Sequence, residues 1–92
     1  DDEEHQTMSQ STWRFQLRNG EILNTLDIPH KALTVHILTG EAWVSHNGQD
    51  IVLHSGESLA VNQDEEAAII STPHFGDTPT LTTLIFEVAR SA

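Results

Sequence analysis

With 92 residues, the chain fits one domain built around one small core. Fourteen Asp and Glu residues against four Lys and Arg residues give a formal net charge of −10, which opposes the binding of nucleic acid and of anionic membranes, so we expect neither as a partner. The absence of Cys excludes disulfide scaffolds, thiol nucleophiles and thiolate zinc sites, and no apolar run approaches the roughly 20 residues that span a bilayer.

The first segment, residues 1–11, carries four acidic residues and one apolar side chain, Met8. Such a segment buries too little apolar surface to offset the entropy lost on ordering. We therefore expect a disordered acidic tail over residues 1–11 and a single β domain over residues 12–92. Met8 is a candidate for a natural start, and we expect a cytoplasmic protein.

After this tail, apolar residues alternate with polar ones at a period of two, which is typical of half-buried β-strands. No segment keeps the 3.6-residue period of an amphipathic helix, and Pro29 opposes a helix at its position. The pattern predicts an all-β fold of antiparallel hairpins with no helix longer than about two turns. We expect a loop over residues 62–66, although Asp64 can instead cap a one-turn helix. The expected strands are 13–17, 22–26, 33–38, 42–46, 51–54, 58–61, 67–72 and 80–89.

A short pattern recurs in which a glycine precedes Glu or Gln. One interpretation is a phosphate cradle, but such a cradle needs a glycine cluster ahead of a helix, and the sequence has none. The pattern instead predicts turns, where a positive φ costs glycine nothing. The four examples are Asn19-Gly20-Glu21, Thr39-Gly40-Glu41, Asn47-Gly48-Gln49 and Ser55-Gly56-Glu57.

Two of these turns, Thr39-Gly40 and Asn47-Gly48, have the form of two-residue hairpin loops. Strand partners would then have residue numbers that sum to 79 across the first loop and to 95 across the second. This register collects the apolar residues on one face, whereas a slip by one residue would mix the two faces. The apolar face holds Leu33, Val35, Ile37, Ala42, Val44, Ile51 and Leu53, with His46 and Gln49 at one end. The opposite face carries the row His36, Trp43 and Val52.

Six histidines raise the question of a metal site, which their spacing tests. In the predicted register, His46 and His54 lie about 16 Å apart, and His36 and His54 about 11 to 12 Å apart. Ligand bonds to a metal are near 2 Å, so neither pair shares one ion. We therefore expect no metal and no cofactor, and we interpret the histidines as solvated surface residues, with His30 and His74 in loops.

Three consecutive glycine turns resemble the middle of a cupin domain: Leu38-Thr39-Gly40-Glu41, Asn47-Gly48-Gln49 and Leu53-His54-Ser55-Gly56-Glu57. The run Gly40-Glu41-Ala42-Trp43-Val44-Ser45, followed by Asp50-x-x-Leu53-x-x-Gly56-Glu57, is similar more narrowly to a short bacterial cupin-like family of unknown function. The resemblance covers roughly residues 17–70 and implies a small cupin-like jelly roll or β-barrel.

Cupins that bind a metal carry two His and a Glu before the closing glycine of the first motif, and a further His after the second. The resemblance places Leu33 at the Glu position, residues 26–29 at the first two His positions and Ala67 at the last. It therefore implies a cupin-like domain that lacks the metal ligands and whose interior is the apolar face. Since cupin-like domains often pair through their sheets, it also implies a homodimer.

No catalytic arrangement is visible in the sequence, so we expect a metal-free binding or interaction module rather than an enzyme. Two surfaces are candidates. His46 and Gln49, at the mouth of the barrel, would bind a small polar ligand. His36, Trp43 and Val52 would form the homodimer interface, because a bare indole on a sheet exposes a large apolar area.

Two alternatives stay open. A small cupin-type enzyme acting on a small polar substrate would draw its general acid and base from His36, Glu41, Asp50 or His54. Ser45 near Asp50 lacks a close histidine base, which argues against a hydrolase triad. A weak metal-binding cupin would instead combine His46 with His30 or His74.

Overall fold

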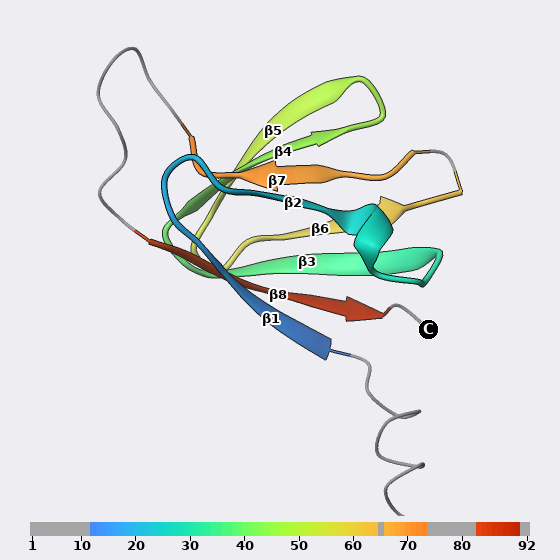
Figure 1. Ribbon diagram of the computed structural model, residues 1–92, viewed down its shortest axis with the longest axis horizontal. Coiled ribbons are helices and arrows are strands. Elements are labelled where there is room, and N and C mark those ends of the chain that lie inside the picture. The colour runs from blue at the N-terminus through green and yellow to red at the C-terminus, as the bar shows by residue number, and fades with distance from the viewer. Residues whose placement is uncertain (1–11, 65, 74–82, 91–92) are drawn as a thin grey trace, which may run out of the picture.

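The computed structural model describes residues 12–64, 66–73 and 83–90, and these residues form a nearly all-β fold (Figure 1). The expected tail over residues 1–11 and His74 lie outside the described residues. Within the described part, no helix is long and apolar enough to cross a membrane. The elements are β1 (Thr12–Leu17), β2 (Ile22–Asn24), the 3-10 turn η1 (Thr25–Asp27), β3 (Ala32–Thr39), β4 (Glu41–His46), β5 (Gln49–His54), β6 (Ser58–Asn62), β7 (Ile69–Ser71) and β8 (Leu84–Arg90).

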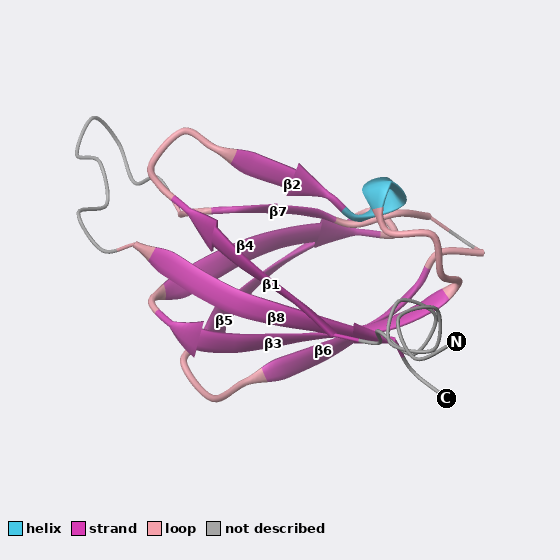
Figure 2. Cartoon of the chain, turned by 60° about the horizontal axis from the view of Figure 1, so that its bottom comes forward, coloured by secondary structure: helices cyan, strands magenta, loops and turns pink. Residues whose placement is uncertain are grey.

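The strands form two antiparallel four-stranded sheets, with the orders β1-β8-β3-β6 and β2-β7-β4-β5. The two sheets lie face to face as layers (Figures 1 and 2). Among the described strands, β4 and β5 are the one consecutive pair within a sheet, and each other connection crosses between the layers. This double Greek-key order is a jelly roll, so the predicted fold class is confirmed.

The predicted hairpin at Thr39-Gly40 is wrong, because the chain crosses there from one sheet to the other. β3 pairs with β6 and β8, whereas β4 pairs with β5 and β7. Inward and outward residues alternate in the same way whether two strands are neighbours or face each other across a core. The pattern therefore predicted the faces but not the partners. The second hairpin is confirmed, since Glu41 pairs with His54 and His46 with Gln49.

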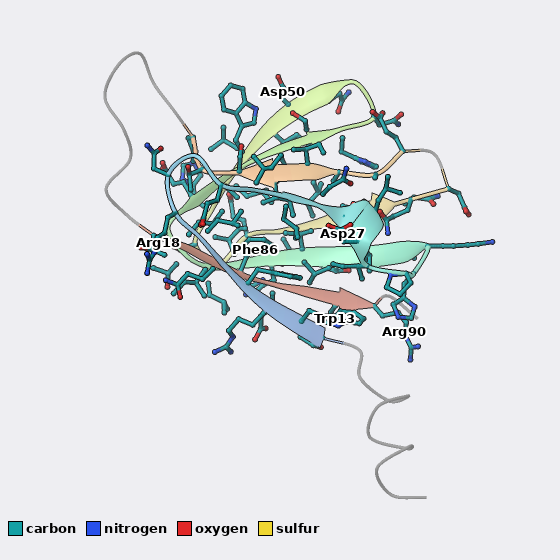
Figure 3. The ribbon with its side chains drawn as sticks, in the orientation of Figure 1. Trp13, Arg18, Asp27, Asp50, Phe86 and Arg90 are labelled. Atoms are coloured by element: carbon teal, nitrogen blue, oxygen red, sulfur yellow. The ribbon has the colours of Figure 1, made fainter. Side chains whose placement is uncertain are left out.

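The predicted apolar face is the interior of the sandwich. Phe86 lies at its centre, between Phe15 of β1 and Ile37 of β3 (Figure 3). The rings of Phe15 and Phe86 stack at a centroid distance of 5.4 Å. Among the described residues, the hydrophobic core side chains with no exposed surface are Leu33, Val35, Ile37, Ala42, Val44, Ala68, Ile70, Leu84, Phe86 and Val88.

The recurring Gly-Glu pattern builds two corners between the sheets. At the first corner, the Arg18 amide donates to Glu21 Oε1 at 2.6 Å, and the Glu21 amide donates back to the Arg18 carbonyl at 3.0 Å. His54 and Glu57 repeat both bonds at 2.7 and 2.9 Å. The glycine inside each corner, Gly20 or Gly56, has a φ near +90°. The interpretation of these glycines as turn residues is confirmed. A Glu follows the glycine at both corners because its side chain accepts a hydrogen bond from the backbone amide three residues earlier.

The described helical turn lies at Thr25–Asp27, where the sequence predicted extended chain. Asn24 starts this turn because its side chain accepts a hydrogen bond from the Leu26 amide at 2.9 Å. No one-turn helix is described at Asp64, where the chain makes a turn instead. The strand expected over 67–72 is shorter, spanning Ile69–Ser71.

Candidate functional site

A row of outward-facing side chains crosses the outer face of the β2-β7-β4-β5 sheet. Ile22 pairs with Ser71, Ser71 with Trp43, and Trp43 with Val52. Their strand neighbours Ile70, Ala42, Val44 and Leu53 point into the core, so these four residues point outward. Ile22 is 63% exposed and Val52 is 41% exposed, while Trp43 is half-buried. We call Ile22, Ser71, Trp43 and Val52 the Trp43 row.

Polar pairs flank the Trp43 row on the same face. On one side, His54 Nδ1 lies 2.9 Å from Glu41 Oε2 across β4 and β5. On the other side, Ser45 Oγ donates to Asp50 Oδ1 at 2.7 Å. Asp50 points away from the interior that holds Phe86 (Figure 3). The polar groups beside the row are therefore paired with each other.

The indole nitrogen of Trp43 is the exception on this face. Trp43 Nε1 is buried and has no hydrogen-bond partner among the described residues. A buried donor without an acceptor costs about 1 to 3 kcal/mol. Three of the four side chains in the Trp43 row are thus apolar, and the indole of Trp43 lacks a hydrogen-bond acceptor.

His36 does not belong to this row, so its predicted place beside Trp43 is wrong. It lies on β3, in the other sheet, where its partners are Ser58 and Glu87. His36 Nδ1 and Ser58 Oγ are 2.6 Å apart, and Arg14 donates to Glu87 Oε2 at 2.7 Å. The error follows from the hairpin that the sequence wrongly predicted at Thr39-Gly40. The cross-strand pairing of Trp43 with Val52 is confirmed.

His46 and Gln49 pair at the end of the β4–β5 hairpin. His46 is half-buried, its Nδ1 is buried without a hydrogen-bond partner, and Gln49 is exposed. His46 follows Ser45, which pairs with Ile69, so it lies beside the start of β7. The two residues come together as predicted, and their role as ligand-binding residues stays a prediction.

Side-chain hydrogen bonds of Thr25 and Gln63 connect the loops before β3 and after β6. Thr25 Oγ1 donates to Gln63 Oε1 at 2.7 Å and accepts from the Ala68 amide at 2.8 Å. Gln63 Nε2 donates to the carbonyls of Ile28 and His30, at 3.1 and 2.7 Å. The network joins the loops before β3 and after β6 around Thr25, which has no exposed surface.

The residues at the metal positions implied by the resemblance do not fit a metal. Leu33 is an apolar side chain with no exposed surface, Ile28 is 4% exposed, and Ala67 offers no ligand atom. In the described part of the chain, no three His, Asp or Glu residues gather closely enough to hold an ion. His36 and His54 lie in different sheets, and the ring of His30 packs against Trp13 at 5.4 Å.

A hollow of about 230 Å³ adjoins the Trp43 row and was missed by the sequence analysis. Ile22 and Ser71 belong to both the row and the hollow. The β1–β2 turn supplies the rest of its lining through Asn19, Gly20 and Glu21, together with Thr72. Pairing between β2 and β7 creates this hollow, and no local pattern in the sequence predicts that long-range pairing.

The chain matches no protein-family profile, and no curated protein sequence matches it. Solved structures do match it along nearly all of its length. A predicted oxalate decarboxylase from Thermotoga maritima aligns with a TM-score of 0.61 at 18% identity, covering 96% of this chain and 70% of that one. A cupin-2 domain protein from Shewanella frigidimarina aligns with a TM-score of 0.55 at 8% identity, covering 95% of this chain and 87% of that one. A cupin protein from Bacteroides fragilis aligns with a TM-score of 0.54 at 15% identity, covering 95% of this chain and 73% of that one.

The chain has the cupin fold. The resemblance seen in its glycine turns is confirmed at the level of structure. At these identities the similarity concerns the fold alone, and the oxalate decarboxylase description belongs to the Thermotoga protein. Any function of this cupin-fold chain therefore has to be argued from its own surfaces.

Proposed function

We propose that this chain is a metal-free binding or interaction module that acts through the outer face of its β2-β7-β4-β5 sheet. One observation carries the proposal: the interior is filled, whereas the Trp43 row leaves apolar side chains outside. Leu33, at the implied metal position, has no exposed surface, while Ile22 is 63% exposed. Exposed apolar side chains that gather on one face and are rimmed by polar residues are typical of an interaction site.

The other outer face supports this choice by contrast. Its central row runs Arg14, Glu87, His36 and Ser58, and all four side chains are polar. Arg14 bonds to Glu87, and His36 bonds to Ser58. The centre of this face is therefore polar and its side chains are paired with each other, whereas the centre of the opposite face holds Trp43.

The enzyme alternative has less support on this surface. Glu41 and His54 contact each other through side chains that are 46% and 59% exposed, and exposed pairs of this kind contribute under about 1 kcal/mol. The Ser45 hydroxyl is already bonded to Asp50. Neither pair faces a described hollow that would hold a substrate against it.

A small polar ligand at the barrel mouth is the second candidate, because His46 Nδ1 is buried without a partner. His46→Phe keeps an aromatic side chain at this position and removes both ring nitrogens. If a polar ligand binds there, a panel of small acids, sugars and amides will contain a compound that raises the Tm of the wild type but not of His46→Phe. A panel that shifts neither protein contradicts this candidate.

Site-specific photocrosslinking in the producing cells tests the main proposal. A photoreactive benzoylphenylalanine replaces Val52 in one variant and Ala60 in a matched control. Both positions are exposed, point outward and lie on edge strands, but in different sheets. We expect a protein adduct from position 52 and none from position 60. The absence of an adduct at position 52, or equal adducts at both, contradicts the proposal.

A bacterial and cytoplasmic setting, expected from the sequence, stays a prediction. The same experiment bears on it if it is performed on fractionated cells. A cytoplasmic protein would give its adducts in the fraction that holds cytoplasmic enzymes.

A further inference from the structure

We propose that the edge of β5 binds an extended, basic segment of a partner protein, which pairs with β5 as a fifth strand of the β2-β7-β4-β5 sheet. This inference rests on the proposed function, because the side chains of the added strand would continue the Trp43 row beyond Val52. The partner must bring backbone hydrogen-bonding groups, an apolar side chain and a cation to this edge.

The β4–β5 hairpin determines which backbone groups of β5 point away from the sheet. Its loop residues, Asn47 and Gly48, have φ values of 56° and 77°, as the type I′ turn of a two-residue loop requires. His46 and Gln49 then form a hydrogen-bonded pair across the loop. Such pairs alternate with non-hydrogen-bonded pairs along an antiparallel ladder. The even-numbered residues of β5 therefore direct their N–H and C=O groups away from β4.

Three residues, Asp50, Val52 and His54, thus have backbone groups at the outer edge of β5. The corner after β5 uses those of His54, whose amide donates to Glu57 Oε1 at 2.7 Å and whose carbonyl accepts from the Glu57 amide at 2.9 Å. Both bonds agree with the outward direction of the His54 backbone. Asp50 and Val52 keep two N–H and two C=O groups for an added strand, because β4 is the one neighbour of β5 among the described strands.

β5 lacks the features that commonly protect a sheet edge from pairing. Its six residues include no Pro, Lys or Arg, and its register with β4 runs without a bulge. The other edges of the two sheets differ. β2 has three residues, β1 presents Arg14, which is bonded to Glu87, and β6 adjoins the face whose central row is polar.

The charge of the sheet favours a basic partner. Its four strands contain Glu41 and Asp50 and no Lys or Arg. Asp50 is exposed, and its carboxylate can accept further bonds besides the one from Ser45 Oγ. A Lys or Arg opposite Asp50 in an added strand would have its Cβ about 5 Å away. Residues 1–11 of this chain carry four acidic residues and no Lys or Arg, so their charge does not suit this edge.

The register of the edge gives the sequence pattern of the added strand. The residue opposite Asp50 is Lys or Arg, and the residue opposite Val52 is apolar, because Val52 is 41% exposed beside Trp43. The residue between them faces the side of the half-buried Ile51. The segment therefore carries a cation and an aliphatic residue two positions apart.

Peptide binding tests this pattern. The probe is the acetylated, amidated peptide Gly-Lys-Thr-Val-Thr-Lys-Gly, which has a Lys two positions from Val in either strand direction. The reordered peptide Gly-Lys-Lys-Thr-Thr-Val-Gly has the same charge and composition without that spacing, so it controls for general attraction to an acidic protein. In NMR titrations of the full chain, we expect a Kd below about 1 mM for the first peptide and a Kd at least about fivefold higher for the second.

A charge swap tests the pairing at Asp50. Asp50→Lys should weaken binding of the Lys peptide by at least about tenfold and strengthen binding of Gly-Glu-Thr-Val-Thr-Glu-Gly by a similar factor. Asp27→Lys is the matched control. It changes the net charge equally at an exposed residue that follows β2, the opposite edge of the sheet, and should change either affinity by less than about threefold. Circular dichroism of each variant checks that the β fold is kept.

Amide hydrogen exchange distinguishes an added strand from a peptide that lies on the sheet face. With the Lys peptide bound, the amides of Asp50 and Val52 should exchange at least about tenfold more slowly. The amide of Ile51 already bonds to β4 and should change little. Binding without this alternation overturns the added strand.

The outcomes separate this inference from the proposed function. A Lys peptide that does not bind at about 1 mM, or a reordered peptide that binds equally well, overturns the basic strand. Slow exchange of the Asp50 and Val52 amides in the protein alone, at high dilution, overturns the free edge. In each of these cases, a protein adduct from position 52 and none from position 60 would still support the proposed function.

Discussion

Truncating the side chain at the centre of the sandwich should cost a large part of its stability. Phe86 has no exposed surface and stacks on Phe15 at 5.4 Å. A domain of this size has a free energy of unfolding of roughly 5 to 14 kcal/mol. Replacing a buried Phe by Ala costs about 3 to 5 kcal/mol, through lost transfer energy and the cavity left behind. Phe86→Ala should therefore remove between about a fifth and all of the free energy of unfolding.

A double-mutant cycle isolates the ring contact. Phe86→Ala, Phe15→Ala and the double variant are unfolded in urea at equilibrium and followed by far-ultraviolet circular dichroism. Stacked aromatic pairs contribute about 0.5 to 1.5 kcal/mol beyond their buried area, so the coupling should fall in that range. A loss under about 1 kcal/mol for Phe86→Ala, set against the 3 to 5 expected of a core Phe, would place Phe86 outside the core. Zero coupling would mean that the two rings do not pack together.

The turn at Gly56, the hydrogen bonds of Thr25 and the implied metal positions can each be tested by a change in stability. Gly56→Ala should cost about 1 to 2 kcal/mol from backbone strain alone, because φ is +89° and an added Cβ meets nothing within 4 Å. In equilibrium urea unfolding, Gly56→Asn should lose less free energy of unfolding than Gly56→Ala. Equal losses would contradict a turn that needs a positive φ at this position. Thr25→Val should cost about 1 to 3 kcal/mol, because the Ala68 amide loses its acceptor, whereas Thr25→Ser should be milder. Zinc or nickel should not raise the Tm, since a site filled at 100 times its Kd would add about 2.7 kcal/mol and shift the melt visibly.

The inside and outside of this fold follow from the sequence because burial is a local signal. Leu33, Val35 and Ile37 alternate with Thr34 and His36, and the structure buries the first three. The order of strands is not local. Thr39-Gly40 reads equally well as a hairpin loop or as a corner between sheets, since both need a glycine with positive φ.

The candidate site was predictable to the same extent. Trp43 and Val52 were paired correctly because a two-residue Asn-Gly loop fixes the register of the strands beside it. Ile22 and Ser71 complete the row through contacts between β2, β7 and β4, whose residues are far apart in the sequence. His36 was misplaced because its own strand was joined to the wrong sheet.

The outer face of β2-β7-β4-β5 is the proposed contact surface of this chain. Methyl NMR with a soluble gadolinium chelate tests it directly, because relaxation enhancement reports which methyl groups meet solvent. At low protein concentration, the methyl groups of Ile22, Val52 and Ala60 should all be strongly relaxed. When an unlabelled lysate of the producing cells is added to the methyl-labelled protein, Ile22 and Val52 should become shielded while Ala60 stays exposed. Shielding of Ala60 with Ile22 and Val52 still exposed, or no change at any of the three, would contradict the claim.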